Sequence, residues 1–153
     1  MARIAAPVAS DLRVRAAETG DASDVAALFD ALGYPCSLDE AAERIAVVTA
    51  DPSQHLLLAE RDGEACGLIA LHMIYAIANG AELARVTALV VSPECHRLGI
   101  GRRLLRAVEA LARRAGVARI EVTSGAQREQ AHAFYRGCGY DDGSLRFVKL
   151  LGD

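Results

Sequence analysis

The sequence predicts an α/β (α+β) fold, with a mixed sheet of six or seven strands flanked by four helices. Three observations lead to this fold class. The chain has 153 residues, which is enough for one domain with its own core. Hydrophobic residues make up 52% of it and charged residues 24%, which excludes a disordered or low-complexity chain. Segments with the two-residue period of a strand alternate with segments of helical period, and that order places helices on both faces of a sheet.

The first elements are expected after a short N-terminal segment. Residues 1–11 contain no long apolar run, so we expect a flexible lead-in there and a single domain over residues 12–153. Leu12–Arg15 is expected to be a short first strand. Between Gly20 and Gly33, apolar side chains recur at helical spacing, and glycine is a frequent residue at a helix end. This stretch is therefore predicted to be the first helix.

Capping and turn residues predict the second helix and the strands that follow it. Ser37 and Glu40 match a capping box, in which each side chain bonds the backbone N–H of the other residue. The helix should end at the Asp-Pro pair of residues 51–52, because proline cannot continue it. His55–Glu60 and Cys66–Tyr75 are then expected to form a hairpin, since a turn that contains Asp-Gly joins them.

The C-terminal half is predicted to contain the most regular helix of the chain. Ala84–Val91 is expected to be a strand that follows an Asn-Gly turn. Over residues 102–116, Leu, Val and Ala fall on one face and Arg on the other, as in an amphipathic surface helix. The remaining expected elements are a strand at Val117–Thr123, a helix at Gln127–Gly137, a strand at Leu145–Leu151 and an additional short strand near Tyr140.

Charge is divided unevenly along the chain. The formal net charge of −3 is too small to indicate a nucleic-acid binder. Residues 1–82 carry 13 acids and 5 bases, whereas residues 83–153 carry 7 acids and 12 bases. All the bases except Lys149 are Arg, whose planar guanidinium suits phosphate and carboxylate oxygens, although genome composition explains this preference equally well. The basic half is where we expect an anionic ligand.

The cysteines and the apolar segments indicate the expected cellular compartment. Four cysteines lie far apart and form no C-x-x-C pair, which argues against a zinc site and against a disulfide framework. The N-terminus lacks the pattern of a signal peptide, and no long apolar run predicts a membrane span. We therefore expect a cytoplasmic protein that has reduced cysteines and binds no metal.

One segment predicts a binding site for phosphate. Leu89–Arg102 has the pattern of a strand, a tight loop with glycines and the start of the amphipathic helix. Such a loop directs backbone N–H groups and the positive end of the helix dipole at one spot. Gly99 and Gly101 allow the backbone to approach a bulky anion, and the neighbouring arginines add positive charge. Leu104 replaces the third glycine of a dinucleotide fingerprint, and no Gly-Lys-Ser/Thr follows. A simple turn is the competing interpretation.

Four segments are informative together: ALVVSP, HRLGIGRRLL, RIEVTSG and REQAHAFYRGCGY. They resemble the motifs of the GNAT superfamily of acetyl-CoA-dependent N-acetyltransferases, and the resemblance extends over residues 12–151. It implies a GNAT-like, mostly antiparallel sheet and acetyl-CoA as cosubstrate. It also implies that the strand end pairs with the pantetheine arm and that the loop wraps the CoA pyrophosphate. The implied cofactor-binding residues are Leu89, Val90, Val91, His96, Arg97, Leu98, Gly99, Ile100, Gly101, Arg102 and Arg128. Tyr135, in the signature A-x-x-[LF]-Y-x-x-x-G-[FY], would act as general acid and protonate the departing CoA thiolate.

The chain departs from the family pattern at three positions. His96 replaces the Arg or Gln that usually opens the loop, which weakens the expected phosphate contact without abolishing it. Arg128 replaces an Asn of many members, and it either reaches CoA or caps the helix. Thr87 replaces a Glu that serves as general base, and threonine cannot accept a proton near neutral pH. Glu82 is the substitute base on this strand, with a solvated acid as the competing interpretation. Water, His72 or no base at all are the alternatives.

Together these observations predict an N-acetyltransferase that moves an acetyl group from acetyl-CoA to a primary amine by direct transfer in a ternary complex. No Ser-His-Asp or Cys-His arrangement is placed to form an acyl-enzyme. The acceptor is expected to be a small-molecule or peptide amine, and the acidic half of the chain favours a cationic one. The resemblance places the acceptor pocket around the first two helices, near Asp30, Tyr34, Asp39, Glu40 and Glu43, and a solvated helix face is the competing interpretation of these acids. Nucleic acid and membrane are not expected partners, and a homodimer is compatible with the prediction. The alternative function is a catalytically silent CoA-binding or regulatory module on the same fold.

Overall fold

The computed structural model describes residues 12–123, 129–143 and 146–152 of the chain. They belong to two compact units, Met1–Thr123 and Ser124–Asp153. The first unit contains the sheet and helices α1 to α3, and the second contains α4. The expected lead-in lies outside the described residues, and the single domain over residues 12–153 stays a prediction.

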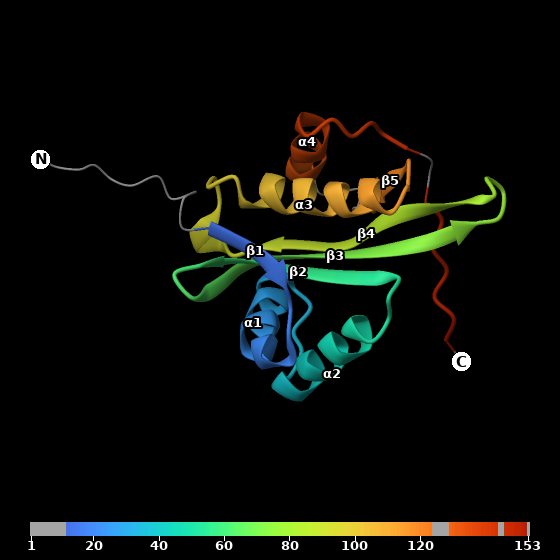
Figure 1. Cartoon of the computed structure of the whole chain (residues 1–153). Helices are drawn as coiled ribbons and strands as arrows, with labels where there is room; N and C mark the ends of the chain where they lie inside the picture. Colours follow the sequence, from blue (N-terminus) through green and yellow to red (C-terminus); the bar gives the residue numbers. More distant parts are fainter. Residues whose placement is uncertain (1–11, 124–128, 144–145, 153) are drawn as a thin grey trace, which may run out of the picture. The chain divides into compact units, whose positions relative to one another are not determined.

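The described part of the chain forms a sheet of five strands in the order β1-β2-β3-β4-β5 (Figure 1). Neighbouring strands from β1 to β4 pair antiparallel, and β5 pairs parallel to β4. The strands are β1 (Leu12–Ala16), β2 (Gln54–Arg61), β3 (Glu64–Ala76), β4 (Ala81–Val91) and β5 (Ile120–Val122). The mixed, mostly antiparallel sheet is confirmed, with five described strands in place of the six or seven expected.

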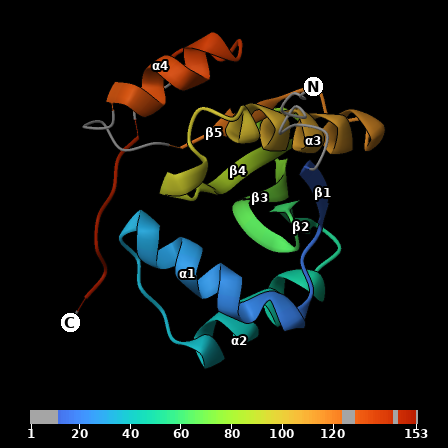
Figure 2. The ribbon, with the colours of Figure 1, turned by 90° about the vertical axis from the view of Figure 1, so that its left-hand side faces the viewer.

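Helices cover both faces of this sheet in the first unit (Figure 2). Here α1 and α2 lie against one face and α3 against the other (Figures 1 and 2). The helices are α1 (Ala22–Leu32), α2 (Leu38–Thr49), α3 (Ile100–Arg114) and, in the second unit, α4 (Glu129–Gly137). Two single 3-10 turns, η2 (Thr19–Asp21) and η3 (Pro93–Cys95), were not expected from the sequence. None of the helices in the described ranges has both the length and the apolar character that a membrane span requires.

The layer of α1 and α2 is held by an apolar core. Val25 and Leu28 of α1 are three residues apart and therefore share one helix face, and both are buried. They pack with Ile45 of α2 and with Leu58 and Leu68 of the sheet. The start of α2 carries the capping box expected from the sequence: Ser37 Oγ accepts from the Glu40 N–H at 3.1 Å, and Glu40 Oε1 accepts from the Ser37 N–H at 2.8 Å.

A glycine in β3 determines how closely α3 approaches the other face. Leu104 and Leu105 of α3 are fully buried, whereas the arginines of α3 are exposed. A Cβ on Gly67 would lie 3.0 Å from Ile100 Cγ2 and 3.2 Å from Leu104 Cδ1, which is tighter than ordinary van der Waals contact. The absence of a side chain at Gly67 therefore lets the first turn of α3 pack directly on the sheet, and this packing positions the loop that precedes α3.

The fifth strand is shorter than predicted. The pattern predicted a strand over Val117–Thr123, and the structure forms one only at Ile120–Val122. Gly116 has a φ of 78°, and the Val117 N–H bonds the Ala112 carbonyl oxygen at 2.9 Å. The residues after α3 thus complete the helix end, a typical role for a left-handed glycine. The Val117 N–H is used there, and the contact with β4 begins only at Arg119, whose carbonyl oxygen accepts from the Ala84 N–H at 2.9 Å.

The C-terminal strands expected at Leu145–Leu151 and near Tyr140 are not formed by the described residues. Residues 140–143 and 146–152 have no strand pairing, and Phe147 and Leu151 are 88% and 90% exposed. An alternating apolar pattern expresses only a preference for a strand, and the strand itself requires a partner that takes up its backbone hydrogen bonds. This part of the prediction is wrong for the described residues.

Candidate functional site

Strand β4 changes its pairing on both sides at the same point. Opposite β3, Ala70 pairs with Ala88 and Leu71 with Val86, which leaves Thr87 as the extra residue of a β-bulge. On the β5 side, the described pairing is confined to Ala84–Val86. Bulges re-aim side chains and end strand pairing, and they are frequent beside active sites. The stretch of β4 beyond the bulge therefore offers backbone groups on an edge that β5 does not pair in the described part of the chain.

The three β4 residues predicted to contact the pantetheine arm lie on this stretch. Leu89 and Val91 are half-buried, and Val90 is buried in the α1–α2 core. Their side chains are anchored in the protein, whereas an extended ligand recognises an edge through main-chain hydrogen bonds. The position of Leu89–Val91 is thus compatible with the prediction.

A short loop leads from β4 into α3. The Ser92 N–H bonds the Cys66 carbonyl oxygen of β3 at 2.8 Å, and η3 follows immediately. The His96 ring returns toward the strand end, with Nε2 at 3.1 Å from the Val91 carbonyl oxygen, so that an Nε2–H would donate to it. Arg97 and Gly99 both have left-handed backbone, with φ of 72° and 75°. The loop is therefore fixed at its start by β3 and by its own histidine.

The N-terminus of α3 has the features of an anion site. Gly99 is the N-cap residue and supplies no side-chain cap, in contrast to Ser37 at α2. The first bond within the helix runs from the Arg103 N–H to the Gly99 carbonyl oxygen at 3.0 Å, so the N–H groups of Ile100 and Gly101 have no acceptor within the helix. The first turn contains no acidic residue. The positive side chains of this turn are repelled by the positive end of the helix dipole, and a bound anion would offset that repulsion.

The backbone conformation of Gly99 by itself favours glycine at this position. That a Cβ here would collide with a bound anion stays a prediction. In the structure, a Cβ on Gly99 would meet no protein atom within 4 Å, and φ is 75°. An L-residue adopts this conformation only at a cost of about 1–2 kcal/mol. Glycine therefore sets the direction in which the loop enters α3.

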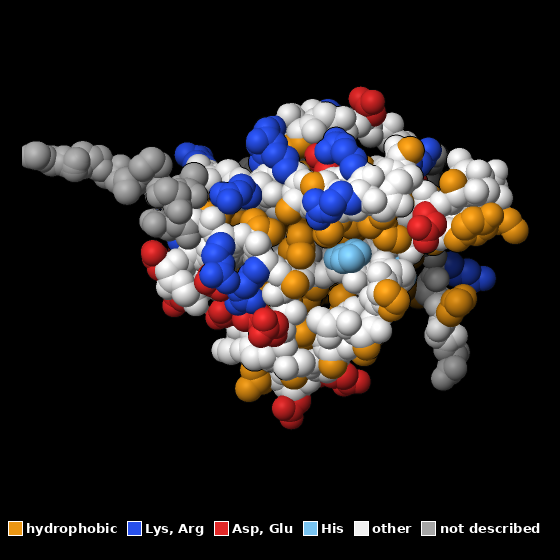
Figure 3. Space-filling view, viewed as in Figure 1, with side chains coloured by type: hydrophobic (Ala, Val, Ile, Leu, Met, Phe, Trp, Pro, Cys, Tyr) orange, Lys and Arg blue, Asp and Glu red, His pale blue; other side chains and the backbone are white. Residues whose placement is uncertain are grey.

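The uneven division of charge is also visible in the first unit. Exposed arginines lie along α3. The exposed acids of the N-terminal part include Asp30 on α1 and three acids on α2, and others lie at Glu18, on the β2–β3 turn and at Glu82 (Figure 3). The acids expected near the acceptor, Asp30, Asp39, Glu40 and Glu43, are all exposed, as is Tyr34. A hollow of about 330 Å³ on α2 is lined by Glu40, Glu43, Arg44, Val47 and Val48. Glu40 is occupied by its capping box, so Glu43 is the acid in this hollow that no cap engages.

The predicted general acid lies in the second unit. The Tyr135 ring packs edge-to-face against Phe134 at 5.3 Å and against Tyr140 at 6.1 Å between ring centroids. Gly139, with a φ of 94°, turns the chain after α4, and the Tyr140 N–H then bonds the Tyr135 carbonyl oxygen at 3.0 Å. The glycine and tyrosine of the signature thus order the end of the helix that carries Tyr135.

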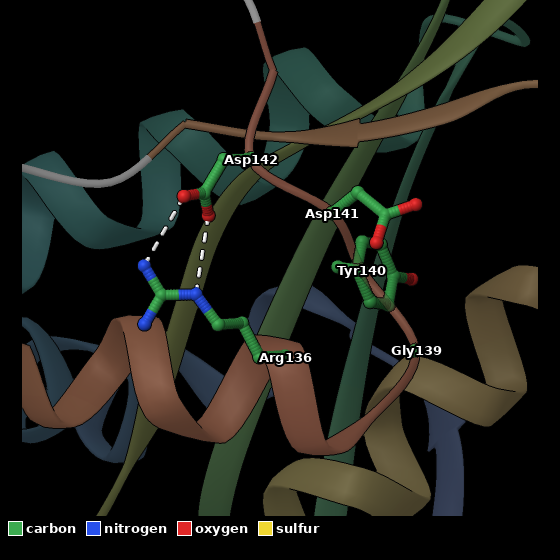
Figure 4. Close-up of a pocket in the computed structure, with 5 residues that line it drawn as sticks. All are labelled: Arg136, Gly139, Tyr140, Asp141 and Asp142. Carbon is green, nitrogen blue, oxygen red and sulfur yellow. Dashed lines mark hydrogen bonds and ion pairs between the residues drawn. The ribbon is translucent and has the colours of Figure 1, made fainter.

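A second hollow of about 360 Å³ lies beside this turn (Figure 4). It is lined by Arg136, Gly139, Tyr140, Asp141 and Asp142. Arg136 Nε and Nη2 donate to the two carboxylate oxygens of Asp142 at 3.2 and 3.3 Å. This cation and anion therefore neutralise each other, and the hollow has no role in our account of the reaction.

Two further residues predicted from the sequence are Arg128, for CoA binding, and Glu82, as the base. Arg128 lies outside the described residues. Glu82 is exposed and pairs with Tyr75 near the tip of the β3–β4 hairpin, five residues before Thr87. That separation corresponds to about 16 Å along an extended strand. Glu82 as the base stays a prediction, and it would have to act at a distance from the bulge.

A row of polar residues across the sheet was not expected from the sequence. His72 is the ladder partner of Gln54 on one side and of Arg85 on the other, and Arg85 is the partner of Glu121. Arg85 Nη2 donates to Glu121 Oε1 at 3.1 Å, whereas the buried Arg85 Nε has no partner. These four residues come from four strands, so only their isolated polarity within apolar runs could have indicated them. Within the described ranges, no group of three or more His, Cys, Asp or Glu is arranged to hold a metal ion.

Residues 23–140 match the model of the acetyltransferase (GNAT) family. The chain belongs to this family. It is 38% identical over 101 residues to the aminoalkylphosphonate N-acetyltransferase of Salmonella typhimurium strain LT2, and the match covers 66% of each chain. It is 33% identical over 139 residues to an aminoglycoside N(6')-acetyltransferase type 1 of Stenotrophomonas maltophilia, which covers 88% of this chain and 90% of that one.

Solved structures agree with this assignment. A GNAT family acetyltransferase of Staphylococcus aureus superposes with a TM-score of 0.80 at 25% identity, over 92% of this chain and 99% of that one. Membership of the GNAT family implies acetyl-CoA as the acetyl donor. The family and the two relatives together identify the protein as an acetyl-CoA-dependent N-acetyltransferase of amines.

Proposed function

We propose that this GNAT enzyme transfers the acetyl group directly to a primary amine of a small molecule in a ternary complex, with acetyl-CoA held along Leu89–Arg102. The observation that carries the proposal is the N-terminus of α3, which lacks both a side-chain cap and an acid. It follows, after a short loop, the edge of β4 that β5 leaves unpaired within the described residues. A diphosphate fits the uncapped N-terminus of α3, because free N–H groups there bind anions. An extended chain with amide groups fits the edge of β4, because it can bond the strand's backbone.

The residues of the loop have separate roles in this proposal. The N–H groups of Ile100 and Gly101 donate to pyrophosphate oxygens, and Arg97 and Arg102 add positive charge. Leu89–Val91 bind the pantetheine amides through the backbone. His96 holds the loop against the end of β4, which its contact with the Val91 carbonyl oxygen supports. In this role a histidine replaces the usual Arg or Gln by positioning the loop.

The chemistry requires a nucleophilic amine and a proton for the leaving sulfur. Acetyl-CoA supplies an activated acyl group as a thioester. We propose that the Tyr135 hydroxyl donates the proton, a role that rests on the match of residues 131–140 to the family signature. The amine enters as the free base, and its proton passes to water or to the polar row at His72. A covalent acyl-enzyme is not needed in this scheme.

The acceptor is proposed to be a small amine, as it is for the two curated relatives. The exposed acids of α1 and α2 favour an acceptor with more than one positive charge, because such a ligand gains from their combined field. The cytoplasmic location, independence of metal ions and a homodimer stay predictions.

The test is thiol release from acetyl-CoA with a panel of amines that includes aminoglycosides, aminoalkylphosphonates and short peptides. Arg102→Ala is compared with Arg113→Ala, because both residues are exposed on α3 but lie in its first and last turns. We expect a raised KM for acetyl-CoA only in Arg102→Ala. Equal KM values in both variants would contradict the proposed cofactor site. Tight acetyl-CoA binding without turnover for any amine would instead support the catalytically silent alternative.

A further inference from the structure

Two cysteines that lie far apart in the sequence meet beside the loop before α3. The β2–β3 register shifts after Ala59, which leaves Cys66 without a partner in β2, and its side chain is only 5% exposed. The Ser92 N–H bonds the Cys66 carbonyl oxygen, and the Cys95 N–H bonds the Ser92 carbonyl oxygen at 2.9 Å. This turn folds Cys95 back toward Cys66, and the interaction between the two thiols adds to the effect of burial on the pKa of Cys66.

The two thiols differ in accessibility. Cys66 Sγ lies 3.4 Å from the Ala59 carbonyl oxygen inside the protein, and burial raises its pKa to about 11. Cys95 is half-buried in η3, which places it nearer to solvent. An oxidant from solution therefore meets Cys95 first, and Cys66 is the adjacent thiol that can resolve the product.

We propose that Cys66 and Cys95 form an oxidation site for peroxides, and that the resulting disulfide ties the cofactor loop to β3 and weakens acetyl-CoA binding. In the first step, Cys95 Sγ attacks one peroxide oxygen, which yields a sulfenic acid and one water molecule. In the second step, Cys66 Sγ attacks the Cys95 sulfur. The S–S bond forms, the S–O bond breaks, and the departing hydroxide takes the Cys66 proton to give a second water molecule. The two thiols lose two electrons, and hydrogen peroxide gains them.

The effect on the loop depends on which of the two cysteines moves when the disulfide forms. A disulfide requires the two sulfur atoms to approach each other to about 2.05 Å. Cys66 is fixed in a buried strand, so the movement falls on Cys95 and on the loop that follows it. That loop holds Arg97 and Gly99 in left-handed conformations and begins α3. This second half of the proposal rests on the proposed cofactor site.

The experiment uses the full chain with hydrogen peroxide as the probe. Treated wild type should lose the mass of two hydrogen atoms, and a non-reducing digest should contain the peptide pair joined through Cys66 and Cys95. A thiol reductant should reverse both changes. Cys95→Ser should remove the cross-link, whereas Cys36→Ser and Cys138→Ser should retain it, because these two half-buried cysteines are matched controls. A cross-link through Cys36 or Cys138, or two intact thiols after treatment, would overturn the oxidation site.

Acetyl-CoA binding is then measured by calorimetry before and after peroxide. We expect about a tenfold or larger rise of Kd on oxidation of wild type, since a displacement of about 1 Å can cost 10²-fold in function. Cys95→Ser should show no such rise. Equal Kd values for reduced and oxidised wild type would overturn the coupling to the loop. If reduced wild type binds no acetyl-CoA, the proposed cofactor site fails, whereas the digest still decides whether the two cysteines are an oxidation site.

Discussion

The strongest test of the cofactor loop is the exchange Gly99→Ala, with Gly33→Ala as its control. Gly99 has φ 75° and ψ 15°, and Gly33, at the end of α1, has φ 96° and ψ 14°. A Cβ at either position would meet no protein atom within 4 Å. Both exchanges therefore introduce the same strain without a collision, about 1–2 kcal/mol for an L-residue in left-handed conformation. Each variant should lose about 2–4 °C of Tm per kcal/mol.

The two variants should differ in acetyl-CoA binding. Relief of the strain at Gly99 rotates the loop and misdirects the first N–H groups of α3, whereas relief at Gly33 disturbs only the end of α1. Loss of one charge-assisted hydrogen bond weakens binding by about 1.5 kcal/mol, which corresponds to a rise in Kd of about tenfold. Calorimetry with acetyl-CoA measures this directly. A Kd for Gly99→Ala equal to that of Gly33→Ala would refute our reasoning about α3, even if both variants lose stability as expected.

Three further predictions concern the acid, the packing of α3 and the buried thiol. Tyr135→Phe should lower kcat about 10²-fold in the thiol-release assay and leave the Kd for acetyl-CoA unchanged, because only the proton donor is lost. Gly67→Ala should lower the free energy of unfolding in urea by about 1 kcal/mol through overpacking against α3, whereas Gly20→Ala, where a Cβ meets nothing, should not. Burial raises the pKa of Cys66 to about 11 in the folded protein, so the unfolded chain loses this proton at a lower pH than the folded one. The free energy of unfolding therefore has its full value below about pH 9 and falls as the pH rises to 11. Urea midpoints should show this loss in wild type and not in Cys66→Ala.

Local patterns predicted the local structure well. The capping box at Ser37 and Glu40 and the helix end at Gly33 depend on groups a few residues apart, so the sequence contains everything that they need. The amphipathic pattern of α3 also predicted which of its residues are buried. The last strand failed for the opposite reason, since Leu145–Leu151 has the required pattern but the described residues find no pairing partner.

In the candidate site too, the features formed by consecutive residues were predictable, and those that depend on contacts between strands were not. The motif from Leu89 to Arg102 was recognisable because the strand, the loop and the helix start are consecutive, and the structure adds that Gly99 has a left-handed backbone. The bulge at Thr87 was not predictable, because a bulge is a relation between two strands. The polar row around His72 was missed for the same reason.

The sequence by itself determined the family, the helix ends, the hairpins and the glycine-containing turn into α3, because each depends on neighbouring residues. Only the tertiary structure decided where β4 parts from β5, how Gly67 admits the first turn of α3, and that the turn after β4 brings Cys95 close to Cys66. The spacing of the cysteines argued against a disulfide framework, and the structure has them free. Strand pairing nevertheless brings two of them together, because register joins residues that are distant along the chain.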